Sequence, residues 1–484
     1  MAREHNYLLG QGERLTQSHS LVRASRPKHP PYEFESARDR LVQPIQQAAR
    51  WATSLPLAAC PGNRVVLEVV LHPRYISKSD QPHALLGAVG LKTIGRRAVE
   101  VSPEAWGIKN PPVSAASDKL FVSVARDKLV RWATELPAWD EKHAGSNELT
   151  QVERIAPLFP SEKLFDTPTH GNYLAELVLH NAGQKTILDE FLTFAHSLGA
   201  EVLADRKRVA GWLSFLPVRL TADITENVAE FSFVRAIRQM PRMRSVLRSP
   251  ARSFSFSTQL PDVDAASPER VVIFDGGLPS DVAPKLARWV NLIEPAGVGR
   301  SEPEALLHGL AVTSSFLFGP LKKGKVIHRP VCNVDHVRVL DDKTGNDLEY
   351  YDVLGRITEH LDSTRYRFAC LSLGPSRAIS DDEVTAWTAE LDLRLAHGTT
   401  LLAVAVGNDG DLEADLGLNR IQPPSDGVNA FAVGASDSRT KSWARAAYSC
   451  VGPGRSPGIF KPDGLAFGGT DRRPFEVKIG RAHV

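Results

Sequence analysis

From Arg270 onward, short apolar runs alternate with segments that have helical periodicity. The expected strands are Val271–Phe274, Val337–Leu340, Phe368–Leu373, Leu401–Val406 and Ala430–Val433, and the expected helices are Glu304–Phe318, Tyr350–Leu361 and Asp381–His397. Short, uniformly apolar strands separated by helices predict a parallel sheet that is covered on both faces. Ligands of such sheets gather at the carboxyl ends of the strands, so the residues directly after each run are candidates for a functional site.

Three polar residues lie at the ends of these expected elements. Asp275 follows the first run and precedes two glycines, His308 opens an expected apolar helix, and Asn408 lies in a glycine-flanked turn after another run. Each residue alone has an ordinary structural explanation, as part of a turn or of a helix start. Their order and their placement at element ends together carry the functional hypothesis.

In this order and at these spacings, the three residues resemble those of the subtilisin-like serine proteases, the subtilase family. The flanking segments are also similar to family segments, at Val337–Asp341, Leu371–Gly374, Asn429–Ala435, Tyr448–Pro453 and Lys461–Asp463. The resemblance covers about Arg270 to Phe475. It departs from the family at Gly276, where Ser or Thr is usual, and at Leu310, where the family has Thr.

The resemblance implies an α/β fold with a subtilisin-like parallel sheet, and a serine endopeptidase that acts on a protein or peptide. His308 would act as the general base, and Asp275 would hold its tautomer. Asn408 would donate to the oxyanion, and the backbone of Ser372, Leu373 and Gly374 would pair with an extended substrate. No cofactor is expected. Calcium is common in the family, but no acidic cluster in this sequence identifies a metal site.

The nucleophilic serine of the family is expected in a Gly-Thr-Ser word downstream of Lys461–Asp463, and no such word follows. One back-translation of the last seven residues resembles a common short-read sequencing adapter. We therefore interpret residues 478–484 as an artefactual tail, and residues 261–477 as a peptidase domain that is truncated before its serine. The alternative function is a non-catalytic, subtilase-derived scaffold that binds extended peptides without cleaving them.

The region before the peptidase domain is predicted to contain an arm, residues 1–62, with a short helix near Ala37–Trp51, and an α+β region, residues 63–260. Two apolar runs in the α+β region are similar, so that Glu68 aligns with Glu176 and His72 aligns with His180. An internal duplication into two repeated units and a chance similarity both explain this match. Residues four apart on a strand lie about 13 Å apart, too far to share a metal ion, so we interpret these pairs as solvated strand edges.

Residues 226–249 carry a basic stripe, made of Arg235, Arg238, Arg242, Arg244 and Arg248. No aromatic stacking platform accompanies it, so we interpret it as a solvated linker and not as a nucleic-acid site. A net charge of +2 likewise gives no argument for nucleic acid or for an anionic membrane.

The sequence also bears on cellular location and on partners. No apolar run approaches the length of a membrane span, and the N-terminus has no apolar h-region, so a cytoplasmic protein is expected. The long N-terminal region and the missing signal peptide look similar to large intracellular bacterial subtilases. That resemblance implies an AAA-type ATPase as a partner, which the residues themselves do not reveal.

Overall fold

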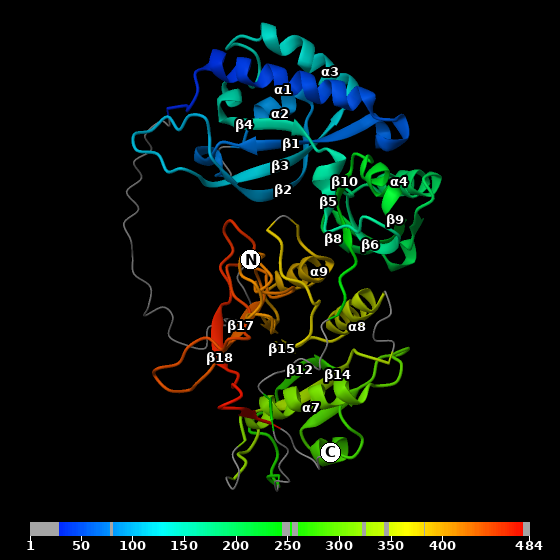
Figure 1. Ribbon diagram of the computed structural model, residues 1–484, viewed down its shortest axis with the longest axis vertical. Helices are drawn as coiled ribbons and strands as arrows, with labels where there is room; N and C mark the ends of the chain where they lie inside the picture. The colour runs from blue at the N-terminus through cyan, green and yellow to red at the C-terminus, as the bar shows by residue number, and fades with distance from the viewer. Residues whose placement is uncertain are drawn as a thin grey trace.

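The computed structural model describes residues 29–77, 81–243, 252–253, 260–321, 326–342, 348–381 and 383–477. The proposed tail at 478–484, together with Arg244 and Arg248 of the basic stripe, lies outside these residues. The described chain forms three parts, which follow one another in Figure 1 from the blue sheet through the green sheet to the larger green-to-red domain.

The first part is an antiparallel sheet in the order β2-β3-β1-β4, with helices on one face (Figure 1). Its elements are α1 (Phe34–Ser54), β1 (Arg64–Leu71), α2 (His83–Val89), β2 (Lys92–Val101), β3 (Ala115–Ala125), α3 (Arg126–Glu135) and β4 (Val152–Pro157). Buried residues of α1 recur at helical spacing, as Leu41, Ile45, Ala48 and Ala52 do. Helix α1 therefore belongs to the core of this part and is longer than the short helix expected in an arm.

The second part is a sheet in the order β5-β10-β6-β9-β7. Its elements are β5 (Leu164–Phe165), β6 (Asn172–His180), α4 (Lys185–Ser197), β7 (Glu201–Val202), β8 (Arg208–Ala210), β9 (Leu213–Thr221), α5 (Thr225–Ala229) and β10 (Val234–Gln239). Read from the other edge, four of its strands lie in the order β7-β9-β6-β10. If the four strands are numbered along the chain, this order is second, third, first, fourth, which is also the order β2-β3-β1-β4 of the first sheet. Strands β1 and β6, which carry the aligned Glu and His residues, hold the same place in the two sheets. This shared topology supports an internal duplication, which we propose.

The expectation that the aligned Glu and His residues lie on solvated strand edges is wrong. Glu68 is 3% exposed, and His72, Glu176 and His180 are fully buried. The reason is that β1 and β6 are interior strands whose two faces are both covered. Among the described residues, no group of His, Cys, Asp and Glu is arranged to hold a metal ion.

The interpretation of residues 226–249 as a solvated linker is also wrong where the structure describes them. Arg235 and Arg238 lie on β10 and are 7% and 2% exposed. Arg238 pairs with Glu176 of the neighbouring strand, and Arg235 pairs with Glu383 of the third part. Arg242 alone of the described stripe is exposed. A stripe of like charge was therefore not a solvated face, because its acidic partners come from distant parts of the sequence.

The third part is a seven-stranded parallel sheet in the order β13-β14-β12-β15-β16-β17-β18 (Figure 1). Its strands are β12 (Arg270–Asp275), β13 (Val290–Ile293), β14 (Asn333–Arg338), β15 (Phe368–Leu371), β16 (Leu401–Ala405), β17 (Phe431–Ser436) and β18 (Gly464–Phe467). The helices are α6 (Ala283–Leu286), α7 (Pro303–Phe318), α8 (Glu349–Ser363) and α9 (Ala386–Leu395). The expected α/β class is confirmed, with an antiparallel α+β region before it.

Two details of the parallel sheet differ from expectation. Strand β14 occupies Asn333–Arg338, several residues before the expected Val337–Leu340, because Asn333, Asp335 and His336 interrupt the apolar pattern of that strand. Strands β13 and β18 were not expected, since each has only four residues: Asn291 interrupts the apolar run of β13, and β18 begins with Gly464 directly after the Lys461–Asp463 turn. Short strands β11 (Arg252–Ser253) and β19 (Phe475–Glu476) pair with each other outside this sheet.

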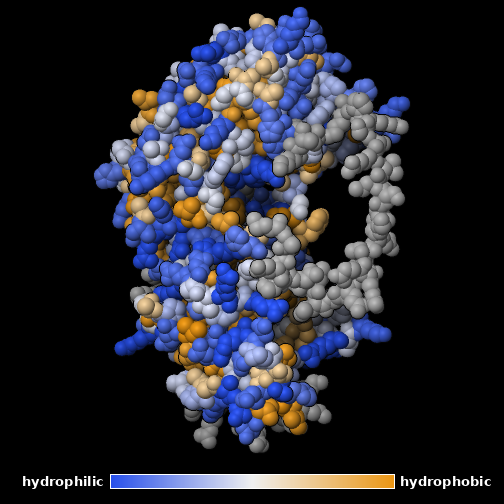
Figure 2. All heavy atoms as spheres, turned by 180° about the vertical axis from the view of Figure 1, so that it is seen from behind, coloured by the Kyte–Doolittle hydropathy of each residue, from blue (hydrophilic) through white to orange (hydrophobic). Residues whose placement is uncertain are grey.

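The second sheet and the parallel domain share one hydrophobic core. Leu174, Phe215 and Met240 of the second part pack in the same cluster as Tyr351 of α8 and Trp387 of α9. Figure 1 shows these two helices between the two sheets. On the face seen in Figure 2, hydrophilic residues predominate and apolar residues form small groups among them. None of the described helices combines the length and the apolar character that crossing a bilayer requires.

Candidate active site

Asp275 is the last residue of β12, at the point where the strand order of the parallel sheet reverses. From β12, the chain continues to β13 and β14 on one side and then to β15 and β16 on the other. The crevice at such a switch point is where parallel sheets place their ligands. The buried apolar residues of β12 thus fix a carboxylate at the favoured position for a site, with its side chain fully buried.

A histidine of the next helix meets this carboxylate. His308 Nδ1 lies 2.7 Å from Asp275 Oδ1, and the His308 side chain is 8% exposed. Helix α7 begins at Pro303, a residue preorganised for the first helical position. His308 therefore lies in the second turn of α7 and does not open the helix as expected. The fold nevertheless brings Asp275 and His308, which are 33 residues apart and were expected to act together, into direct contact.

Two glycines allow α7 to approach the turn after Asp275 this closely. A Cβ on Gly276 would lie 2.3 Å from the carbonyl oxygen of Ala305, and one on Gly309 would lie 2.1 Å from the carbonyl oxygen of Gly277. The departure from the family at Gly276 thus has a steric reason. Instead of a side-chain hydroxyl, the Gly276 N–H donates to Asp275 Oδ1 at 2.7 Å.

The electrostatics of the pair favour an ionised Asp275. Burial alone would raise the pKa of Asp275, but the charge and hydrogen bond of His308, together with the hydrogen bond from the Gly276 N–H, hold that pKa below its usual value. Among the described residues, Asp275 Oδ2 is buried and accepts no hydrogen bond. A buried carboxylate against an imidazole can fix the tautomer of the ring and stabilise its protonated form.

His336, on β14, is a residue of the site that the sequence analysis missed. It is fully buried, accepts a hydrogen bond from Gly277 N at 3.0 Å and contacts Thr313 Oγ1 of α7 at 2.8 Å. In the sequence, His336 is one of several polar residues of this strand and directly follows Asp335. Such a residue has no distinguishing neighbour in the sequence, because its partners are 23 and 59 residues away.

Asn408 and Ser372 are brought together at the rim of the same sheet. Asn408 follows β16, Ser372 follows β15, and both line a cavity of about 370 Å³. Val312 and Ser315 of α7 line it too, one to two turns beyond His308, which itself is not among the lining residues. In the part of the chain that the structure describes, no serine hydroxyl is hydrogen-bonded to the His308 ring.

Leu373 and Gly374, the other residues expected to bind substrate, are buried. The chain directly after them contacts the end of the second part: Met243 forms an antiparallel bridge with Pro375, and Ser376 N donates to Arg242 O at 2.8 Å. The predicted substrate-binding backbone therefore continues into a segment that contacts the residues following β10.

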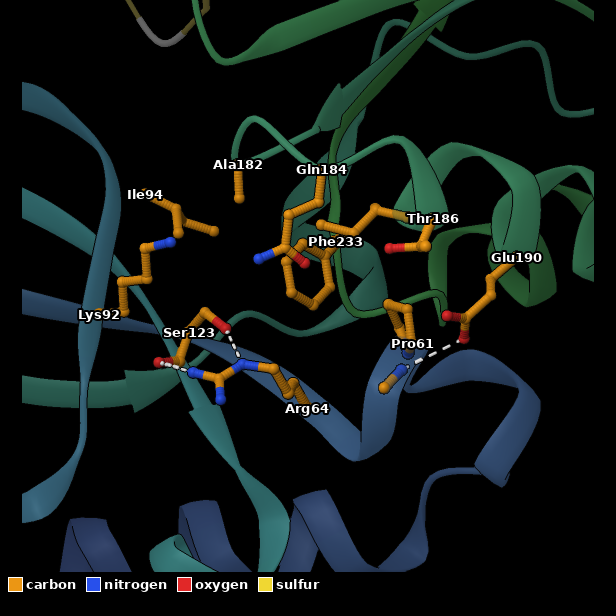
Figure 3. Close-up of a pocket in the computed structure, with 12 residues that line it drawn as sticks. Pro61, Arg64, Lys92, Ile94, Ser123, Ala182, Gln184, Thr186, Glu190 and Phe233 are labelled. Atoms are coloured by element: carbon orange, nitrogen blue, oxygen red, sulfur yellow. Dashed lines mark hydrogen bonds between the residues drawn. The ribbon is translucent and has the colours of Figure 1, made fainter.

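A second cavity, of about 170 Å³, lies between the first and second parts (Figure 3). Arg64 and Lys92 contribute cationic groups to its wall, and Glu190 accepts a hydrogen bond from Gly62 N. Arg64 donates to Ser123 Oγ and Ser123 O, so its guanidinium is already engaged. This cavity is separate from Asp275 and His308, and its lining holds no paired acid and base.

Comparison with known proteins identifies the family. The subtilase family model matches residues 220–481, more than half of the chain, and no curated protein sequence matches. Among solved structures, the chain is similar to the PatG macrocyclase in complex with peptide, at 14% identity and a TM-score of 0.31, covering 42% of this chain and 66% of that one.

It is also similar to the prenylagaramide maturation protease PagA, at 19% identity and a TM-score of 0.30, covering 44% of this chain and 69% of that one. A structure of the subtilase cytotoxin SubAB assembly matches at 17% identity and a TM-score of 0.28, covering 40% of this chain and 61% of that one. The chain spans 63–66% of the length of the first PatG and PatA structures. Similarity at this level transfers no residue roles. The family match over more than half of the sequence shows that the chain belongs to the subtilase family.

Proposed function

We propose that this chain is part of a serine endopeptidase in which Asp275 and His308 are two members of a catalytic triad. The observation that carries the proposal is the 2.7 Å contact between their side chains at the switch point of the parallel sheet. Membership of the subtilase family supports it, because serine peptidases define that family.

In this mechanism His308 accepts the proton of the nucleophilic serine and later passes it to the leaving amine. Asp275 accepts a hydrogen bond from the Nδ1–H of His308, so that Nε2 is left as the base, and it stabilises the imidazolium that forms. Asn408 donates its side-chain amide to the oxyanion of the tetrahedral intermediate. The backbone of residues 372–374 pairs with the extended substrate, which is a protein or peptide.

We propose further that the serine is encoded downstream of codon 477, and that the segment carrying it occupies the cavity lined by Asn408, Ser372 and Val312. That cavity lies next to α7 and is lined largely by apolar groups, as a seat for a buried helix would be. Cleavage specificity is set partly by that segment. The AAA-type ATPase and the cytoplasmic location stay expectations from the sequence alone.

The test begins with the gene. Genomic DNA downstream of codon 477 should encode an in-frame Gly-Thr-Ser word, and the extended protein should react with a fluorophosphonate probe and cleave peptides. His308→Ala should lower turnover by roughly 10⁴-fold or more, because triad members act as a unit. His397→Ala, which alters an exposed histidine, is the matched control and should leave turnover unchanged.

Near-native turnover in His308→Ala would exclude the proposed triad. A different residue in the place of the serine, combined with binding of extended peptides, would instead establish the scaffold function. The chain of 484 residues should not be labelled by the probe at any serine, since His308 has no serine hydroxyl to activate among the described residues.

A further inference from the structure

His336 connects the three elements that hold the Asp275–His308 pair. It stands on β14, beside β12, in register with Ile273. One ring nitrogen accepts from Gly277 N in the turn after Asp275, and the other contacts Thr313 of α7, five residues after His308. A single buried side chain thus joins the strand, the turn that follows the carboxylate, and the helix that carries the base.

The hydrogen bonds define the tautomer of this ring. Because the Gly277 N–H can only donate, Nε2 of His336 must be the unprotonated acceptor. Nδ1 then carries the proton and donates it to Thr313 Oγ1. The ring is neutral in this arrangement, as its complete burial favours. The ionisable groups that influence its pKa are Asp275 and His308.

The turn that His336 holds contacts both members of the pair. The N–H of Gly276 donates to Asp275 Oδ1, and the next N–H, that of Gly277, donates to His336. On the other side, Gly309, which follows His308, packs against Gly277 O without room for a methyl group. A shift of Gly277 would therefore move the carboxylate and the helix backbone beside the imidazole together.

We propose that His336 is a positioning residue of this site: a neutral acceptor-and-donor bridge that fixes the Asp275 turn against α7 and so holds Asp275 Oδ1 at His308 Nδ1. The geometric claim stands on the described contacts, and its catalytic consequence rests on the proposed function. A histidine suits this place because it accepts on one side and donates on the other. Glutamine is another side chain that can do both, whereas leucine can do neither.

The test measures the His308–Asp275 hydrogen bond directly, without peptidase activity. The full chain, labelled with ¹⁵N-histidine, is studied by NMR, and the His308 Nδ1 proton is assigned by its loss in His308→Gln. In His336→Leu, the Gly277 N–H loses its acceptor, so the His308 Nδ1 proton should exchange with solvent about tenfold faster than in the parent chain. His336→Gln should restore most of the protection.

Val334→Ala is the matched control, since Val334 is buried two residues earlier on the same face of β14 but its side chain makes no hydrogen bond. It should lower the melting temperature without changing the exchange of the His308 proton. If His336→Leu fails to fold, Thr313→Val, which removes the hydroxyl that holds Nδ1, takes its place in the comparison. Unchanged protection in the Leu variant, or in Thr313→Val, would overturn the proposal, as would equal acceleration in Val334→Ala.

These outcomes are separate from a failure of the proposed function. Accelerated exchange in His336→Leu, together with an extended protein that lacks peptidase activity, would support the positioning role and exclude the peptidase. Unchanged exchange together with an active extended protein would exclude the positioning role and support the peptidase.

Discussion

The contact of Glu176 with the parallel domain predicts a large and specific loss of stability in Glu176→Gln. Glu176 is fully buried, and its Oε2 accepts from Arg238 Nε at 2.7 Å while its Oε1 accepts from Tyr351 of α8 at 3.1 Å. Removal of its charge leaves Arg238, which is 2% exposed, without its carboxylate. Breaking a buried ion pair by loss of one partner costs roughly 3–5 kcal/mol.

That cost is a large part of the total stability, because domains have free energies of unfolding of about 5–15 kcal/mol. Glu68→Gln is the matched control. Glu68 holds the corresponding place on β1 and pairs with Lys119 at 2.6 Å, within its own sheet. Glu68 is itself buried, but its partners are less enclosed than Arg238: the Lys119 side chain is 10% exposed and the Arg154 side chain is 55% exposed. Water can reach these cations, so we expect a smaller cost of roughly 1–2 kcal/mol.

The assay is urea unfolding of the full chain, followed by circular dichroism and by tryptophan fluorescence. Trp387 is fully buried in the core shared by the second sheet and the parallel domain, and Glu176 lies at the same boundary. Trp132 and Trp139 report on the first part as Trp387 does on the shared core, so the midpoints compare the two substitutions directly, and Glu176→Gln should lower the midpoint more than Glu68→Gln does. Equal effects of the two substitutions would refute the argument that burial between two parts of the chain makes the Glu176 pair costly to break.

Three further predictions follow from single residues. Gly276→Ser restores the residue usual in the family but places Cβ 2.3 Å from Ala305 O, so it should cost roughly 1–3 kcal/mol of stability by thermal unfolding, whereas Gly87→Ser, with open space around its Cβ, should be near neutral. Burial lowers the pKa of His336 to about 4, below its unfolded value of about 6.5. The free energy of unfolding should therefore fall by up to about 3 kcal/mol as the pH is lowered from about 6.5 to about 4. His336→Gln should reduce this loss of stability. Burial lowers the pKa of Lys163 to about 7, so the unfolded chain binds an extra proton between about pH 7 and 10, and stability should rise with pH over that range. Lys163→Met should raise stability at pH 7 and weaken this rise. A lower stability of the variant at that pH would contradict the reasoning.

The parallel domain could be predicted because its information is local. Runs such as Val271–Phe274 are apolar throughout, since a strand covered on both faces has no solvated side, and they place Asp275 at a strand end without knowledge of the rest of the fold. The contact between Asp275 and His308 followed from the family resemblance. Their catalytic roles, and those of Asn408 and residues 372–374, stay predictions.

The features that were wrong or missed depend on distant partners. Arg238 looks like a surface charge until Glu176, 62 residues earlier, is placed beside it on the neighbouring strand. Glu68 and Glu176 were assigned to open edges because the alternation of a strand cannot tell whether another layer covers its polar face. His336 was missed for a related reason: what distinguishes it is the turn at Gly277 and the helix residue Thr313, and neither is near it in the sequence.

The core shared by the second sheet and the parallel domain has a consequence for how the protein can be divided. A fragment starting at Pro261, the boundary that the sequence suggested, would lose Met240 from that core and Arg235 from its pair with Glu383. Helices α8 and α9 would then expose apolar side chains that are buried in the shared core, and Glu383 would lose its partner Arg235. The parallel domain thus depends on the second sheet to cover α8 and α9, and the region before Pro261 cannot be removed without exposing that face to solvent.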